Sequence, residues 1–319
     1  MHGPVADLST RVAGLELRNP FLLASGIWGE TGESLRGAYE AGAGGVITKS
    51  IGREPRTGYP NPTVEMYDRW GFLNAMGLPN PGIAEYPREI AIARGGGALV
   101  IGSVFGHDAE EFAELGAALT ETGVAALELN LSCPHAEGLG SEVGSDPSAV
   151  EDITRAVVRR TKLPVIAKLT PNTHDIVALA QAAERGGASA ISAINTLRGL
   201  AIDVRLQRPT LSHGLGGLSG PAIKPVGLAC VYQVFRGVRI PVIGVGGILT
   251  ADDALEYLLA GARAVEVGTA VALDGIRVFG TLVRELGRRM DELGVRRVED
   301  LIGAAHRSDP PPGAPRDPL

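Results

Sequence analysis

Short runs of aliphatic residues alternate along the chain with longer amphipathic stretches. The runs are FLLAS (from residue 21), GVITK (45), ALVIGS (98), AALELN (125), VIAKL (165), SAISAI (189), VIGVG (242) and AVEVG (264). Stretches with apolar residues at helical spacing cover residues 32–43, 108–123, 146–161, 173–188, 222–237 and 250–262. Eight almost continuously apolar strands alternating with helices predict an α/β fold, a parallel sheet closed into a (β/α)8 TIM barrel. The alternative is a doubly wound open sheet, but an early glycine-rich dinucleotide fingerprint is missing.

Two segments between strands are too long to be simple connections. Residues 50–97 follow the second strand, and residues 195–241 follow the sixth. Long loops in a compact domain are usually functional, so we expect insertions at the active-site end of the barrel. We expect residues 1–305 to form a single barrel domain and the proline-rich residues 306–319 to form a disordered tail.

Composition narrows the class of protein. The chain has 319 residues, of which 45% are hydrophobic and 21% charged, and its net charge is −6. There is no basic run that would suit nucleic acid, no apolar run near the roughly 20 residues of a membrane span, and no signal-peptide layout at the N-terminus. Two cysteines, Cys133 and Cys230, do not make a disulfide framework. We therefore expect a cytoplasmic protein that binds neither nucleic acid nor membrane.

Candidate chemistry collects where the predicted strands end, which is where active sites lie in TIM barrels. Only four of the 30 basic residues are lysines, and alternation along a strand places Lys49 and Lys168 inside the barrel. A buried amine without a counter-charge is costly, so the two lysines suggest an anionic ligand; an internal ion pair of Lys168 with Glu128 is the alternative. Glycines after the last two strands favour a phosphate site, although glycine there is also common in ordinary turns.

Eight segments, in their order along residues 8–275, resemble class 1 dihydroorotate dehydrogenases. They are KS at Lys49, NAMGLPNPG at Asn74, ELNLSCPH at Glu128, AKLTPN at Ala167, INTLRGLAID at Ile194, GGLSGPAIKP at Gly216, GVGGI at Gly244 and VGTA at Val267. That family consists of FMN-containing (β/α)8 barrels that oxidise dihydroorotate to orotate in pyrimidine biosynthesis. The resemblance implies that Cys133 is the catalytic base, which removes the C5 proton while hydride leaves C6 for the flavin.

The resemblance also assigns the remaining candidates. It implies substrate binding by Lys49, Asn74, Met76, Gly77, Leu78, Asn130, Asn195 and Thr196. It implies FMN binding by Ala24, Ser25, Lys49, Ser50, Ser103, Asn130, Lys168, Ile194, Gly220, Gly246, Gly247, Gly268 and Thr269, the last four around the phosphate. Lys168 would lie beside the flavin edge where reduction builds negative charge. Ser103 departs from the family pattern, which usually has Asn there. No metal site is implied, Cys230 is expected to pack in the core, and Lys224 is left out of the site.

The motifs INTLRGLAID, LTPN and NAMGLPNPG are most similar to the NAD-linked class 1B. Such enzymes contain a homodimer of catalytic subunits together with a second subunit that carries FAD and a [2Fe–2S] cluster. The fumarate-using class 1A is an alternative. So are a dihydropyrimidine dehydrogenase-type domain, which shares LNLSCPH and AKLTPN, a flavin-free barrel using Lys49 or Lys168 as a Schiff base, and a non-catalytic FMN-binding module. The presence of bound flavin, and which substrates the protein turns over, distinguish these alternatives.

Overall fold

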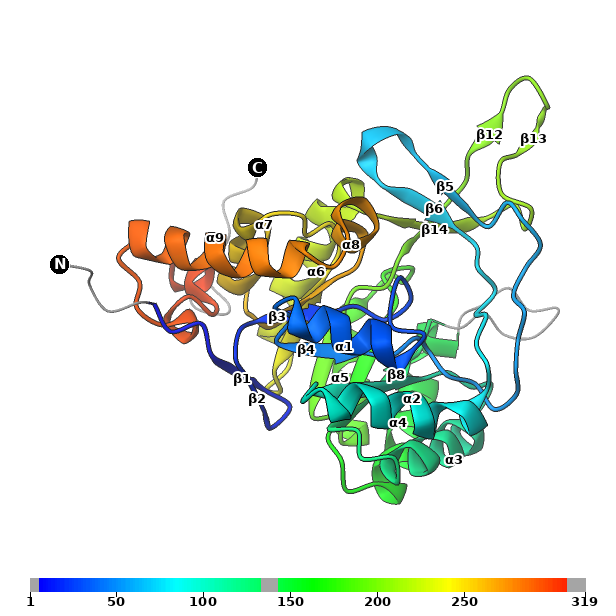
Figure 1. Cartoon of the computed structure of the whole chain (residues 1–319), viewed down its shortest axis with the longest axis horizontal. Helices are drawn as coiled ribbons and strands as arrows, with labels where there is room; N and C mark the ends of the chain where they lie inside the picture. Colours follow the sequence, from blue (N-terminus) through cyan, green and yellow to red (C-terminus); the bar gives the residue numbers. More distant parts are fainter. Residues whose placement is uncertain (1–5, 133–142, 309–319) are drawn as a thin grey trace.

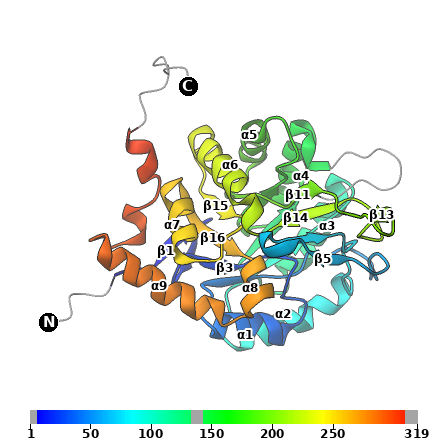
Figure 2. The ribbon, with the colours of Figure 1, turned by 90° about the horizontal axis from the view of Figure 1, so that it is seen from above.

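The centre of the molecule is a closed barrel of eight parallel strands. The computed structural model describes residues 6–132 and 143–308. The barrel strands are β3 (Phe21–Leu23), β4 (Gly45–Ile47), β7 (Val100–Val104), β8 (Ala126–Asn130), β9 (Val165–Leu169), β10 (Ala190–Ala193), β15 (Val242–Val245) and β16 (Ala262–Val267). They are joined in the order β10-β15-β16-β3-β4-β7-β8-β9, which closes on itself. Figure 2 shows the helices arranged around these strands. All eight predicted strands are confirmed, and the open-sheet alternative is wrong.

Helices surround the barrel. They are α1 (Gly32–Glu40), α2 (Tyr86–Gly95), α3 (Ala109–Thr120), α4 (Pro147–Arg160), α5 (Ile176–Gly186), α6 (Lys224–Gly237), α7 (Ala251–Leu259), α8 (Thr269–Asp274) and α9 (Val278–Glu292). Short 3-10 helices are η1 (Asp68–Trp70), η2 (Ile83–Glu85), η3 (Val143–Ser145), η4 (Pro221–Ile223), η5 (Val298–Asp300) and η6 (Ala304–Ser308). The helices α1, α3, α4, α5 and α7 begin at a Thr or Asp whose side chain accepts a backbone N–H. Their caps and periodicity made them predictable, whereas α2, α8 and α9 were not predicted.

Side chains on the inner face of the strands form two layers of opposite character. The lower layer is apolar and takes one residue from each strand: Leu22, Ile47, Ile101, Ala126, Ile166, Ala190, Ile243 and Ala264. The hairpin of β1 (Thr10–Val12) and β2 (Leu15–Leu17) closes this floor with Val12, Ala13 and Leu17. Two residues further along each strand, on the same face, stand Ala24, Lys49, Ser103, Glu128, Lys168, Ser192, Val245 and Glu266. A largely polar layer therefore rests on a buried apolar floor.

The two insertions pair with each other. Their strands β5 (Val64–Met66), β6 (Phe72–Asn74), β11 (Leu197–Gly199) and β14 (Gly216–Ser219) form one sheet in the order β11-β14-β6-β5, and β12 (Ile202–Asp203) and β13 (Arg208–Pro209) form a hairpin. Asn74 stands opposite Gly217 in this sheet and donates its Nδ2–H to the Gly217 carbonyl at 3.1 Å. Sheet and hairpin project from the barrel (Figure 1). Insertions were expected here, but their common sheet was not.

The C-terminal part of the described chain packs on the helical layer. His306 lies in η6, with its Nε2 2.9 Å from the Ala260 carbonyl oxygen and its ring stacked on Tyr232 at 3.9 Å. Residues 306–308 thus belong to the folded barrel rather than to the tail expected there, and residues 309–319 lie outside the described residues. Within the described ranges, no helix combines the length and the apolar character that crossing a membrane requires.

Replacing Gly217 with Ala is expected to destabilise the sheet that joins the insertions. A Cβ at Gly217 would overlap Thr196 Oγ1 and lie 2.7 Å from Thr196 Cβ, so Thr196 or the strand must move. Such overpacking typically costs about 1–3 kcal/mol of unfolding free energy, which urea unfolding measures. Gly287→Ala is the matched control, because a Cβ there meets nothing within 4 Å. Equal unfolding free energies for the two variants would contradict this close packing.

Candidate active site

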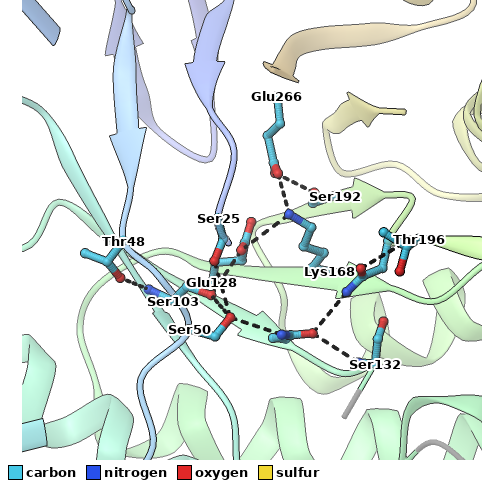
Figure 3. Close-up of polar contacts among 12 residues, drawn as sticks. Ser25, Thr48, Ser50, Ser103, Glu128, Ser132, Lys168, Ser192, Thr196 and Glu266 are labelled. Atoms are coloured by element: carbon cyan, nitrogen blue, oxygen red, sulfur yellow. Dashed lines mark hydrogen bonds and ion pairs between the residues drawn. The ribbon is translucent and has the colours of Figure 1, made fainter. Parts of the chain in front are cut away.

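The polar layer has a charged centre made of Lys168 and two carboxylates, here called the charged triad. Lys168 is 5% exposed, and its Nζ lies 2.5 Å from Glu266 Oε2 and 3.7 Å from Glu128 Oε1 (Figure 3). Glu266 also accepts a hydrogen bond of 2.6 Å from Ser192 Oγ. The expectation that Lys168 lacks a counter-charge is therefore wrong. The alternative of an internal ion pair holds, but Glu266, which sequence reasoning missed, is a closer partner than Glu128.

Proton affinities within the charged triad are strongly perturbed. Burial and the nearby charge of Glu266 raise the pKa of Glu128 to about 8, against the opposing effect of Lys168. Burial acts to lower the pKa of Lys168, but the two carboxylates outweigh burial and raise it. Glu128 Oε1 accepts a hydrogen bond of 3.1 Å from Ser103 Oγ, while Oε2 has no hydrogen-bond partner among the described residues. At neutral pH the triad therefore favours a protonated Glu128.

A row of serine hydroxyls leads away from Glu128. Ser103 Oγ lies 3.1 Å from Ser50 Oγ, which in turn lies 3.3 Å from Ser25 Oγ. Thr48 fixes the start of the row, because its Oγ1 accepts the Ser103 backbone N–H at 2.9 Å. Ser103 and Ser50 are buried, and Ser25 is partly exposed. The row comes from the ends of three neighbouring strands, so barrel closure brings these residues together, as predicted.

Asparagine amides extend the polar network beyond the serines. Asn130 Nδ2 donates to Ser50 Oγ at 3.0 Å, and Asn195 Nδ2 donates to Asn130 Oδ1 at 3.2 Å. The Thr196 backbone N–H donates to Asn195 Oδ1 at 2.8 Å, and the Ser132 backbone N–H donates to Asn130 Oδ1 at 3.3 Å. The amides are only partly buried, so they combine fixed positions with access from outside.

Lys49 is the second inward lysine, and it is weakly paired. Its side chain is 12% exposed, and its Nζ lies 3.5 Å from Oε2 of Glu30, a carboxylate that is 58% exposed. Ion pairs with an exposed partner contribute about 1 kcal/mol or less. An anionic ligand therefore competes easily for this amine.

The predicted substrate residues from the first insertion are brought to the site in part. Gly217, which accepts the Asn74 amide, packs against Thr196, so Asn74 lies next to the asparagine network. Met76, Gly77 and Leu78 follow on a partly buried loop, in which Gly77 (φ +74°) and Leu78 (φ +56°) are left-handed. Among the described contacts this loop touches Tyr59, and none links it to the asparagine network.

Most of the predicted phosphate residues lie around one turn. Gly246 (φ +126°) and Gly247 (φ +70°) follow β15, and a Cβ on Gly247 would lie 2.7 Å from the Gly220 carbonyl oxygen. Thr269 Oγ1 lies 3.3 Å from Oγ of Ser219, the residue before Gly220. Gly268 instead borders Ala24, since a Cβ on Gly268 would lie 3.4 Å from the Ala24 Cβ. Ile194 is buried, and its N–H donates to the Val245 carbonyl at 3.1 Å.

Tyr257 holds the Gly246–Gly247 turn in place, and it was not identified as a site residue from the sequence. Its hydroxyl donates to the Gly246 carbonyl at 2.7 Å, and burial raises its pKa far above the ordinary value. A Cβ on Gly244 would lie 2.5 Å from Tyr257 Cδ1, and one on Gly227 would overlap the hydroxyl oxygen. Gly244 of the GVGGI motif therefore makes room for Tyr257.

Of the two cysteines, the structure describes only Cys230. Cys133, the predicted base, lies outside the described residues, although the preceding Ser132 is held by Asn130. Cys230 packs against the core from α6, and burial raises the pKa of its thiol; its packing role is confirmed. Lys224 pairs with Asp253 at 2.6 Å and with Glu256 at 3.0 Å, which agrees with leaving it out of the site.

Known proteins resemble this chain over almost its whole length. The model of the family described as dihydroorotate dehydrogenase matches residues 7–290. A protein of Thermococcus kodakarensis is 50% identical over 301 residues, which cover 94% of this chain and 99% of its own. Proteins of Thermoplasma acidophilum (48% identical; 95% of this chain, 100% of its own) and Methanocaldococcus jannaschii (46%; 94% and 98%) follow. All three are named dihydroorotate dehydrogenase B (NAD(+)), catalytic subunit.

Replacing Glu128 with Gln is expected to flatten the pH dependence of stability. The pKa of Glu128 is raised to about 8 from 4.5, so its contribution to stability is present below the unfolded pKa and is lost as pH rises through the folded one. Between pH 5 and 8, the unfolding free energy of the ligand-free wild type should fall by roughly 2–4 kcal/mol more than that of the variant.

Urea unfolding at both pH values measures the difference. Glu16→Gln is the control, because it neutralises a carboxylate that is 76% exposed and should follow the wild type. If the unfolding free energy of Glu128→Gln changes with pH as much as that of the wild type, the burial of an excess carboxyl group at position 128 is contradicted.

Proposed function

The chain belongs to the dihydroorotate dehydrogenase family, and on that premise we propose that it is the catalytic subunit of an NAD-linked, class 1B enzyme. It oxidises dihydroorotate to orotate in cytoplasmic pyrimidine biosynthesis. One observation carries the proposal: an inward lysine and a network of partly buried amides meet a buried lysine at the same end of the barrel. This combination suits a small anionic amide ring lying beside a redox cofactor.

The family is flavin-dependent, and we propose FMN as the flavin. The residues present fit it in two respects. The buried Lys168 amine offers positive charge for a ring edge that becomes negative, and the left-handed Gly246–Gly247 turn, where a Cβ on Gly247 would collide with the Gly220 carbonyl, offers backbone N–H groups to a phosphate. A flavin held by these residues would supply the acceptor for the hydride that leaves the substrate. The proposed binding residues are Ala24, Ser25, Lys49, Ser50, Ser103, Asn130, Lys168, Ile194, Gly220, Gly246, Gly247, Gly268 and Thr269.

The substrate residues proposed for this chain bind and orient the pyrimidine ring. Amide side chains both donate and accept hydrogen bonds, so Asn74, Asn130 and Asn195 match a ring edge that carries N–H and C=O groups. The hydrogen bonds among Asn130, Asn195 and Ser50 fix the amide orientations before the substrate arrives. Lys49 neutralises the substrate carboxylate, and Met76, Gly77, Leu78 and Thr196 complete the site.

We propose Cys133 as the base that takes the C5 proton. Support comes from the NLSCPH motif and from the Asn130 side chain, which accepts the backbone N–H of Ser132 and so places the start of this segment beside the amides. A thiolate is a competent base when its surroundings lower its pKa.

The proposal includes a second subunit that passes electrons to NAD⁺. The relatives' names contain both "NAD(+)" and "catalytic subunit", which implies such a partner. We propose that it carries FAD and a [2Fe–2S] cluster and that two copies of this chain form a dimer. The projecting hairpin exposes Ile202 (58%), Val204 (82%) and Leu206 (59%), which is typical of surfaces that assembly covers.

An anaerobic half-reaction tests the function. The purified chain should show a yellow flavin spectrum that bleaches when L-dihydroorotate is added. Fumarate should fail to reoxidise it, and NAD⁺ should do so only with the partner subunit present. Flavin that dihydroorotate does not reduce, but dihydrouracil does, would replace the proposal with the dihydropyrimidine dehydrogenase alternative.

The variant Cys133→Ala separates catalysis from binding in the same assay. It should retain flavin and bind orotate but bleach on the order of 10²–10⁴ times more slowly, the usual contribution of a positioned base. Cys230→Ala is the matched control and should bleach at the wild-type rate. Equal rates for all three proteins would remove Cys133 from its role.

A further inference from the structure

The charged triad contains one carboxylate more than its lysine can neutralise. Glu266 takes the closer position on Lys168, at 2.5 Å, while Glu128 stands at 3.7 Å. Both carboxylates are fully enclosed, at 1% and 0% exposure. If all three groups were ionised, the barrel would bury a net negative charge, which is strongly unfavourable.

Glu128 is the member of the triad that holds the compensating proton. Of its two oxygens, Oε1 accepts the Ser103 hydroxyl, and Oε2 has no partner within the described part of the chain. Glu266, by contrast, uses both oxygens, one for Ser192 and one for Lys168. The groups that face Glu128 are thus Ser103 on β7, Lys168 on β9 and Glu266 on β16, and its protonation responds to charge both at Glu266 and at Lys168.

A route for a proton connects Glu128 to the surface. Ser103, Ser50 and Ser25 present three consecutive hydroxyls separated by 3.1 and 3.3 Å, and the last of them is partly exposed. A hydroxyl donates one hydrogen bond and accepts others at the same time, so a row of hydroxyls can pass a proton along. The apolar floor of the barrel closes the opposite side.

We propose that Glu128, in mildly alkaline solution where it is ionised, takes up one proton from solvent, through Ser25, Ser50 and Ser103, when negative charge arrives beside Lys168. The inference rests on the proposed function, because the reduced flavin supplies that charge. The hydride from the substrate delivers both electrons, and the additional proton bonds to a Glu128 carboxylate oxygen, so no further oxidant or reductant is needed. Glu128 thereby keeps the net charge inside the barrel constant as the flavin is reduced. Because it acts on the flavin site through Lys168, it is a positioning residue.

Counting protons during electrochemical reduction of the bound flavin tests the inference. With an electrode as the reductant and a pH-indicating dye in weak buffer at about pH 8–9, the wild type should take up about one proton more per flavin than Glu128→Gln. The exposed-carboxylate control Glu16→Gln should match the wild type. Equal uptake by the wild type and Glu128→Gln from about pH 6.5 to 9.5 would overturn the inference.

Two further measurements keep the test decisive if Glu128→Gln binds flavin poorly. Glu266→Gln leaves Lys168 with Glu128 as its one carboxylate, so Glu128 should stay ionised and the additional proton should again be lost. Infrared spectra of the flavin-free chain should show the carbonyl band of a protonated buried carboxyl at neutral pH, and Glu128→Gln should lack it. Wild-type uptake in Glu266→Gln, or an unchanged band in Glu128→Gln, would contradict the inference.

The route is tested by Ser103→Asn. An amide can still donate to Glu128 but cannot relay a proton, so the number of protons should stay the same while proton uptake after a step in electrode potential, followed with the same dye, slows at least several-fold. An unchanged rate would exclude the serine row as the path. Dihydroorotate takes no part in these measurements, so its failure to bleach the flavin would count against the proposed function alone.

Discussion

The ion pairs of Lys168 with Glu266 and Glu128 are the interaction on which the rest of the site depends. Removing a single charge from water costs several kcal/mol even after relaxation, so a lysine at 5% exposure needs carboxylates at short distance. The barrel meets this need by drawing one charged residue from each of three strands that are far apart in the sequence. Because the apolar floor below excludes water, the charges respond to each other and to whatever binds above them.

The same layering explains why the binding residues gather at one end. The strands place polar side chains two residues above the apolar layer, and the two insertions then build a sheet over that end. The contact between Asn74 and Gly217 ties the insertions together and brings Asn74 next to Thr196. Substrate residues from the insertions and cofactor residues from the strands therefore lie in one region, although they span most of the chain.

Periodicity and helix caps were sufficient to predict the eight strands and the helices α1 and α3 to α7, because these are local properties. Strand alternation also placed Lys49 and Lys168 inside the barrel. The partnership with Glu266 was beyond this reasoning, since it joins residues 98 positions apart and depends on which strands face each other across the interior of the closed barrel. The sequence nevertheless contains a local signal for Glu266, which is the single acidic residue of its apolar strand and stands at an inward position.

The common sheet of the insertions was not predicted because its strands have only three or four residues, too few for a periodic pattern. The reason for glycine at position 244 was not predictable, because it is the ring of Tyr257, which lies 13 positions further along the chain. Cys133 lies outside the described residues, so its proposed role rests on the NLSCPH motif and on the placement of Ser132 by Asn130.

The most direct test of this account is a crystal structure of the chain with flavin and orotate bound. The orotate ring is expected to lie among Asn74, Asn130 and Asn195, with its carboxylate against Lys49. Lys168 is expected to contact the flavin while remaining paired with Glu266. Orotate bound away from the asparagine network, or a Lys168 amine that has no contact with the flavin, would contradict it.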